Sequence, residues 1–189
     1  MTPVRPTLTA ELIRHLANVG SGTRTPPLTG AQWAALRFFA RANRLTRTAS
    51  AFASFHGTTR GTASQTVKSL VDHGYLARRT DPGDGRRVIF ELTSAGRAAL
   101  ARDPAAALER AIETLTAKQH SELASTIQAL VSQLDSRTDA PFGYCDGCRH
   151  LDARGGEAFP YCALTGEPVT EVDRESLCCA FSPTRAGDD

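Results

Sequence analysis

The stretch that decides the fold is residues 58–92, TTRGTASQTVKSLVDHGYLARRTDPGDGRRVIFEL. It opens with a polar-fronted helix pattern from Thr62 to His73, which stops at Gly74. A strand pattern follows at Tyr75–Arg79, and a second one lies at Val88–Leu92. The residues between the two strands are turn formers and arginines. The pattern therefore predicts a helix followed by a β-hairpin with a basic tip.

A helix followed by such a hairpin is the order of a winged helix-turn-helix, a fold that reads DNA. Short polar and basic residues near the start of the helix allow its backbone to enter the major groove. The residues expected to contact DNA from this helix are Arg60, Thr62, Ser64, Gln65 and Lys68. The residues expected to contact DNA from the hairpin are Arg78, Arg86 and Arg87. An arginine at such a tip suits a narrow minor groove.

The distribution of charge supports this location for a DNA-binding surface. Net charge is only +2, but residues 37–97 hold eleven Lys and Arg against four Asp and Glu. Residues 139–189 hold four basic residues against ten acidic ones. The middle of the chain is therefore the expected phosphate-binding surface, and the last part is not.

Apolar residues at helical spacing flank this region on both sides. The first stripe comprises Leu8, Leu12, Leu16 and Val19, and the second comprises Leu108, Ile112, Leu115, Leu123, Ile127, Leu130 and Leu134. A domain of this size has little core to cover such stripes, so we expect a second copy of the chain to cover them. Helices expected at 29–42 and 45–56 complete a DNA-binding core at about 29–100. The predicted fold class is mainly α with a small β-hairpin wing, a helical dimerisation region and an irregular cysteine-rich tail.

Two segments resemble the MarR family of bacterial transcription factors. They are GYLARRTDPGDGRRVIFELTSAGRAAL at 74–100 and LTGAQWAALRFFA at 28–40, and the resemblance spans roughly residues 8–138. It implies a homodimer built from N- and C-terminal helices, with a recognition helix at about 59–72. It also implies that Arg86 enters the minor groove, that Asp84 supports the wing, and that the DNA site is a palindromic operator. Members usually act as repressors that a ligand or an oxidant relieves.

The sequence departs from the common family pattern in two places. The segment SFHGTTRGTASQTV at 54–67 lacks the usual leucine-alanine pair of the preceding helix. The family also normally ends near the second dimerisation helix, whereas this chain continues for about 50 residues.

Those additional residues contain all five cysteines of the chain. Cys145 and Cys148 form a C-x2-C pair, Cys162 stands alone, and Cys178 and Cys179 are adjacent. With one of the adjacent pair facing inward, they supply the four thiolates that zinc or an iron–sulfur cluster requires. Zinc ribbons usually have two C-x2-C pairs, so a single pair favours an iron–sulfur cluster over zinc. Metal-free thiols remain the third alternative, and His150 is expected to be solvated rather than a ligand.

We therefore divide the chain into a winged-helix domain with dimerisation helices at 1–138 and a cysteine-rich tail at 139–189. The predicted function is a homodimeric DNA-binding repressor of a palindromic operator, with a tail that responds to a metal or to redox change. The alternative is a structural zinc or protein-interaction tail. Regulation would then come from a small molecule in the helical cleft near Trp33, Arg37 and Phe38, although these residues are more typical of helix packing.

An enzyme and a membrane protein are both disfavoured by the sequence. There is no nucleotide-cradling glycine motif and no G-x-S-x-G, and the histidines before the tail have no spaced carboxylate or cysteine partner. No apolar run is long enough to span a membrane, and the N-terminal residues lack a signal-peptide pattern. We expect a cytoplasmic protein whose partners are double-stranded DNA and a second copy of itself.

Overall fold

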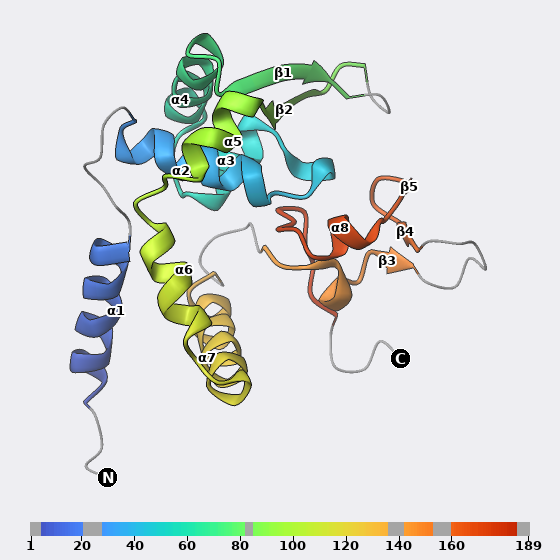
Figure 1. Ribbon diagram of the computed structural model, residues 1–189. Coiled ribbons are helices and arrows are strands. Elements are labelled where there is room, and N and C mark those ends of the chain that lie inside the picture. The colour runs from blue at the N-terminus through green and yellow to red at the C-terminus, as the bar shows by residue number, and fades with distance from the viewer. Residues whose placement is uncertain (1–4, 21–27, 82–84, 136–141, 153–159, 185–189) are drawn as a thin grey trace.

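The computed structural model describes residues 5–20, 28–81, 85–135, 142–152 and 160–184. The helices before the tail are α1 (Pro6–Gly20), α2 (Gly30–Arg41), α3 (Ala49–Phe55), α4 (Arg60–Asp72), α5 (Ser94–Leu100), α6 (Ala106–Glu113) and α7 (Ala117–Asp135). A short 3-10 helix, η1 (Arg44–Thr46), joins α2 to α3, and the strands β1 (Leu76–Thr80) and β2 (Val88–Leu92) form a hairpin. Figure 1 shows this mainly helical arrangement, and it agrees with the predicted fold class.

Threonines define where the helices of the winged core, residues 28–100, begin. Thr29, Thr48, Thr59 and Thr93 precede α2, α3, α4 and α5, and each side chain accepts a hydrogen bond from a backbone N–H in the first turn. Such caps satisfy N–H groups that have no partner within the helix, and each is worth about 1 kcal/mol. At Thr29 the cap is a full capping box with Gln32.

The core of the domain forms around α2, whose apolar residues are almost fully buried. Trp33, Leu36, Phe38 and Phe39 are all no more than 2% exposed. They pack with Phe52 of α3 and with the buried face of α4, which consists of Ala63, Val67 and Leu70. Because α4 buries one face against this cluster, its opposite face remains exposed to solvent.

The hairpin forms as predicted, with β2 at Val88–Leu92 as expected and β1 one residue later at both ends than the predicted Tyr75–Arg79. Its register runs from Leu76 opposite Leu92 to Thr80 opposite Val88. At the tip, the Asp81 N–H donates to the Arg87 carbonyl at 2.9 Å. Below the tip, the Phe90 N–H of β2 donates to the Arg47 carbonyl at 2.9 Å, which ties the hairpin to the segment between η1 and α3.

The helices α1, α6 and α7 extend from the winged core on the side away from α4 (Figure 1). The second apolar stripe lies on a pair of helices, because the chain breaks between α6 and α7, where Thr116 and Gln119 cap the second helix. Large apolar side chains on α1 and α7 are between 37% and 67% exposed, and they are Leu8, Leu12, Ile13, Leu16, Val19, Leu123, Ile127, Leu130 and Leu134. A single chain thus leaves the apolar faces of α1 and α7 exposed, whereas Leu108, Ile112 and Leu115 are half-buried. No described helix is both long and apolar enough to cross a membrane.

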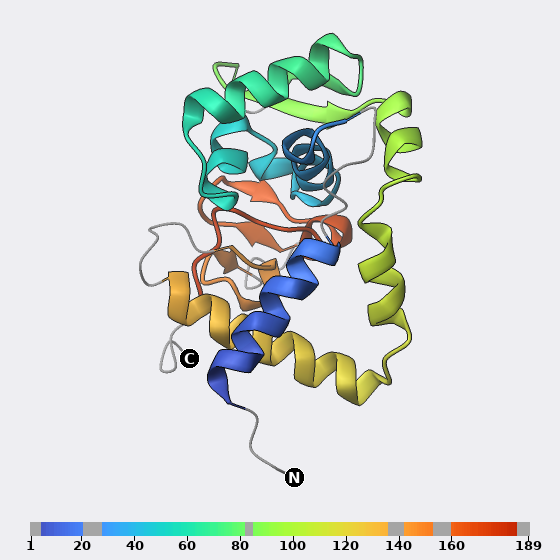
Figure 2. The same cartoon turned by 90° about the vertical axis from the view of Figure 1, so that its left-hand side faces the viewer.

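The tail folds as short elements that pack on the winged core. They are η2 (Cys145–Gly147), β3 (Leu151–Asp152), β4 (Tyr161–Cys162), β5 (Glu167–Pro168) and α8 (Glu171–Arg174), with the strands antiparallel in the order β3-β4-β5. Figures 1 and 2 both place these elements on the side of the winged core opposite α4. The contact is formed by main chain as well as side chains, since Ala42 and Leu177 make a parallel bridge.

Substitution of Gly96 tests how closely α5 packs against the base of the hairpin. A Cβ at this position would lie 2.2 Å from the Tyr75 carbonyl oxygen, which is backbone and cannot move aside freely. We expect Gly96→Ala to lower the free energy of unfolding by roughly 1–3 kcal/mol, the usual cost of overpacking. The measurement is chemical denaturation followed by circular dichroism.

Gly61→Ala is the matched control, because a Cβ there would meet only the Thr59 hydroxyl at 3.9 Å. An alanine in this exposed helical position should leave stability unchanged or raise it. Equal stability of the two variants would contradict the close approach of α5 to the start of β1.

Candidate functional site

The predicted recognition helix is α4, and its solvent face carries the residues expected to contact DNA. Arg60, Thr62, Ser64, Gln65 and Lys68 are all exposed, whereas Ala63, Val67 and Leu70 between them are buried. The Thr59 hydroxyl caps the helix, and it also lies 2.9 Å from the Thr62 hydroxyl. The first turn of α4 therefore presents a fixed, positively polarised helix end, which favours a negatively charged partner such as a phosphate.

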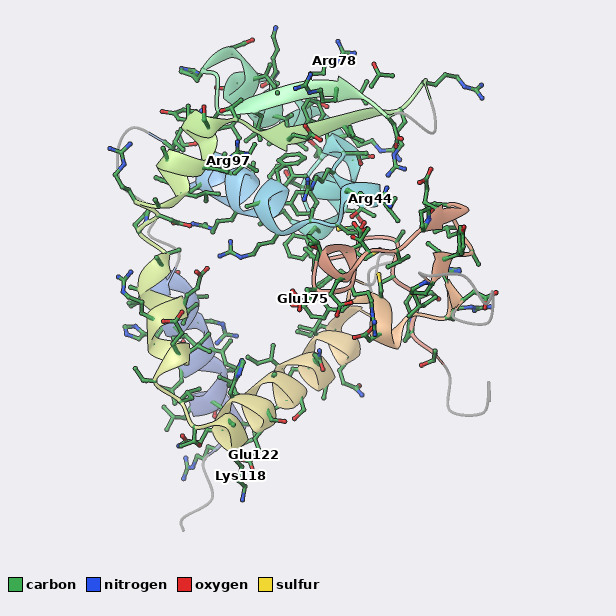
Figure 3. The ribbon with its side chains drawn as sticks, turned by 45° about the vertical axis from the view of Figure 1, so that its right-hand side comes forward. Arg44, Arg78, Arg97, Lys118, Glu122 and Glu175 are labelled. Carbon is green, nitrogen blue, oxygen red and sulfur yellow. The ribbon has the colours of Figure 1, made fainter. Side chains whose placement is uncertain are left out.

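Of the three hairpin arginines predicted to contact DNA, two are exposed and the third is half-buried. Arg78 and Arg86 are exposed, and Figure 3 shows Arg78 at the outer side of β1, near α4. Arg87 is half-buried and forms an ion pair with Asp81 at 3.4 Å. Asp84, the predicted support of the wing, lies outside the described residues. Among the described arginines of the hairpin tip, Arg86 is therefore the more accessible one.

The tail brings four of its five cysteines to one cavity of about 190 Å³. The thiols of Cys145, Cys148, Cys162 and Cys178 line this cysteine cavity, together with His150. Cys179 does not line it and packs instead against the hydrophobic core of the winged core. No three His, Cys, Asp or Glu side chains among the described residues are arranged to hold a single metal ion.

Backbone hydrogen bonds hold each of these cysteines in place. Cys145 begins η2 and Cys148 follows its last residue, with the Cys148 N–H donating to the Cys145 carbonyl at 2.9 Å. Cys162 ends β4 and begins a tight turn that closes at Gly166, which has a φ of +69°. Cys178 pairs with Gly143 in an antiparallel bridge, with N–H···O distances of 3.1 and 2.8 Å. The turns are thus set by main-chain contacts that do not involve the sulfurs.

The winged core supplies one wall of the cysteine cavity. Asn43, Leu45, Thr46 and Arg87 line it from that side. The first three belong to the elbow, which we define as residues 42–46 between α2 and α3. Arg87 lies at the tip of the hairpin, so the same cavity contacts the elbow, the wing and the tail. The sequence did not predict this contact between the cysteines and the DNA-binding elements.

Asn43 is fully buried at this wall and links the tail to the elbow. Its side-chain N–H groups donate to the Asp173 carbonyl at 2.9 Å and to the Cys145 sulfur at 3.9 Å. Its side-chain oxygen accepts from the Leu45 N–H at 2.8 Å, and its own N–H donates to the Leu177 carbonyl at 2.7 Å. One asparagine thus satisfies groups on both sides of the contact.

An ion pair reinforces the same contact. Arg44 donates from Nε to the buried Asp173 carboxylate at 3.0 Å and from Nη2 to the Pro168 carbonyl at 2.6 Å. Figure 3 shows Arg44 between the winged core and the tail. Asp173 also accepts from the Thr170 N–H and hydroxyl, so its buried charge is well compensated.

Burial raises the pKa of three of the cysteine thiols. The pKa of Cys145 rises to about 11, first because of desolvation and then because of Cys178, Cys148 and Cys162. Desolvation also raises the pKa of Cys178, and it raises that of Cys179 to about 12. A thiol that stays protonated is a poor nucleophile, so these three are not arranged as reactive free thiolates. A metal that displaces their protons would change this.

The cleft residues named from the sequence are part of the packing. Trp33 and Phe38 belong to the buried core, and Arg37 donates to the buried Asp103 carboxylate at 2.9 Å. A second, more open cavity of about 340 Å³ lies beside β2 and α5. The residues that line it are Phe39, Ala40, Arg47, Glu91, Leu92, Arg97 and Leu100.

Comparison with known proteins confirms the resemblance stated from the sequence. Residues 27–87 match the model of the MarR family. A MarR transcriptional regulator from Methanosarcina mazei Go1 is 18% identical, with a TM-score of 0.50 over 67% of this chain and 96% of that one. CouR from Rhodococcus jostii RHA1, solved with p-coumaroyl-CoA, is 19% identical, with a TM-score of 0.51 over 65% of this chain and 88% of its own. No curated protein sequence gives a significant match. At these identities the solved structures establish the winged-helix fold alone.

Asn43 offers a direct test of the contact between tail and elbow. In Asn43→Ala the Asp173 carbonyl and the Leu45 N–H lose their buried partner, so we expect the free energy of unfolding to fall by roughly 2–3 kcal/mol. We also expect the amides of the tail to exchange faster with solvent. Denaturation and hydrogen–deuterium exchange measure the two effects.

Gln65→Ala removes an amide of similar kind from an exposed position and serves as the control. It should leave both stability and tail protection unchanged. The assignment of Asn43 as the link fails if its substitution behaves like that of Gln65.

Proposed function

From the MarR-family sequence of residues 27–87 and the winged-helix fold of the chain, we propose that the protein is a homodimeric repressor that binds a palindromic operator in double-stranded DNA. The observation that carries this proposal is the joint placement of the α4 face and the hairpin. A capped helix with exposed polar residues lies beside a basic two-stranded wing, as major-groove and minor-groove readers require.

The exposed residues divide into two kinds of contact. Gln65 has the side-chain amide that can make a bidentate contact with adenine, and Thr62 and Ser64 can contact bases or phosphates. Arg60, Lys68 and Arg78 carry the charge that neutralises phosphates, and this part of the affinity depends on salt. Arg86 of the wing enters the minor groove. Arg87, paired with Asp81, contributes to wing position more than to direct contact.

A dimer follows from the two apolar stripes that one chain leaves exposed. The stripes on α1 and α7 include Leu12 and Ile127, which are 56% and 47% exposed. Covering them with a second copy removes apolar surface from water at about 25 cal/mol per Å². A two-fold dimer then presents two copies of α4 to two half-sites of a palindrome.

Regulation is proposed to act through the tail, by a metal or a redox change at the cysteines. The support is that the cysteine cavity includes residues of the elbow and Arg87 of the wing. A change in the shape or charge of the cavity therefore acts directly on a side chain of the hairpin. A structural zinc site or a protein-interaction role of the tail is the alternative, and it predicts operator affinity that does not depend on the state of the cysteines.

A small-molecule effector is the second candidate for regulation. The cavity beside β2 combines Arg47 and Arg97 with the apolar residues Phe39, Leu92 and Leu100. This lining suits an apolar molecule that carries an acidic group. The comparison with CouR fits this alternative, because that regulator was solved with an acyl-CoA ligand.

The wing assignment predicts that Arg86→Ala weakens operator binding about tenfold at physiological salt, because a minor-groove arginine supplies on the order of 1–2 kcal/mol. Operator fragments can be selected from a random duplex library, and fluorescence anisotropy gives the dissociation constant. Arg102→Ala, at an exposed arginine after α5, is the charge-matched control and should bind like the native protein. Unchanged affinity of the Arg86 variant would rule out its minor-groove role.

The dimer assignment predicts that Ile127→Glu converts the protein to a monomer. Two buried carboxylates at a two-fold interface would repel each other and lose solvation. Light scattering gives the mass, and the monomer should also bind the palindrome at least tenfold more weakly. Gln128→Glu adds the same charge to the neighbouring position. A variant at Ile127 that remains dimeric would show that α7 does not form the interface.

A further inference from the structure

The cysteine cavity is larger than a single metal ion needs. Four thiolates on one zinc ion would lie about 3.8 Å apart, because each Zn–S bond is about 2.3 Å long. In the described part of the chain no three metal-binding side chains are arranged around such a point. Four cysteines instead line one cavity of about 190 Å³. A polynuclear group meets this geometry, because each thiolate then binds a different metal atom.

We propose that the cavity binds a cubane iron–sulfur cluster of four irons and four sulfides, with Cys145, Cys148, Cys162 and Cys178 as its ligands. Each Sγ forms one bond to one iron, and each thiol releases its proton to solvent as that bond forms. The step transfers no electron. Cys179 takes no part, because it packs against the hydrophobic core.

The other walls of the cavity suit such a group. Leu45, Leu151 and Leu164 line it with apolar surface, which limits the access of water to a cluster. Asn43 donates an N–H group toward the Cys145 sulfur at 3.9 Å, a long contact of the kind that tunes clusters in other proteins. A cluster held by four thiolates is anionic, and Arg87 places a cation at the same wall.

His150 also lines the cavity but is not needed as a ligand. Four thiolates already satisfy the four irons of a cubane. The imidazole therefore serves as a useful negative control, because it lies at the same cavity and belongs to a residue type that often binds metals.

The position of the cavity gives the cluster a route to the DNA-binding elements. Thr46 and Arg87 line the cavity, and the Arg47 carbonyl next to Thr46 accepts the Phe90 N–H of β2 at 2.9 Å. A filled cavity holds the elbow and the tip of the hairpin in one arrangement, and an empty one removes that support. This regulatory consequence rests on the DNA-binding function proposed above, whereas the cluster assignment does not.

The test of the cluster uses the full-length chain, purified without oxygen and reconstituted with sulfide and equal amounts of ferrous and ferric iron, so that cluster assembly needs no oxidant. We expect a coloured protein with visible charge-transfer absorption and about four irons and four sulfides per chain. Cys145→Ser, Cys148→Ser, Cys162→Ser and Cys178→Ser should each lose most of the bound iron. Cys179→Ser and His150→Ala should retain it. Circular dichroism shows whether each variant is folded.

Cys179→Ser is the sharpest control, because it changes the same residue type one position away from a ligand. Loss of iron from the folded Cys179 variant, with retention by the folded Cys178 variant, would overturn the ligand set. A colourless protein that binds about one zinc ion per chain and no iron would overturn the cluster itself.

Operator binding by the cluster-loaded protein and by the folded Cys162→Ser protein tests the coupling. We expect their dissociation constants to differ on the order of tenfold, a usual size for coupling between two sites. Equal affinities would overturn the regulatory role while the spectroscopic result stands. Failure of both forms to bind any selected duplex would instead overturn the proposed function, and the iron content would still report on the cluster.

Discussion

The buried side chain of Asn43 joins the tail to the winged core. It occupies the elbow between α2 and α3, and its amide groups meet main chain from the elbow on one side and from the tail on the other. A buried amide stabilises a fold only when its donors and acceptors are satisfied, and among the described residues no buried side-chain N or O atom lacks a partner. The tail is thereby held in one orientation, which places the cysteines under the hairpin.

The elbow also determines where the hairpin sits. Arg47, which follows η1, donates from Nε to the Ala42 carbonyl at 2.8 Å, and its own carbonyl receives the Phe90 N–H. The DNA-binding wing and the cysteine cavity are thus attached to the same few residues. In a two-state regulator, coupling between sites requires an element that both sites contact, and the elbow is such an element. Under the proposed function, a change at the cavity reaches the hairpin without movement of α4.

Local features of the fold were readable from the sequence, and long-range ones were not. The strands of the hairpin follow from local patterns, so Val88–Leu92 was placed correctly. Arg86 is exposed whereas Arg87 pairs with Asp81, and the sequence does not say which of the two is the more accessible. Nor does it say that Cys178 lines the cavity while Cys179 packs against the core. The hydrogen bond between Asn43 and Asp173 joins residues 130 positions apart, and no periodic pattern in the sequence predicts it.

The separation of Asn43 from its partner also has a consequence for how the protein is made. Ribosomes add residues from the N-terminus, and domains fold as units while the chain is still growing. The winged core, residues 28–100, is complete long before Asp173 and Leu177 are added, and until then the Asn43 side chain has only the elbow as its protein partner. The nascent winged core therefore exists first without its cysteine wall. Docking of the tail is a late step of maturation, and it adds the cysteine cavity to a domain that has already folded.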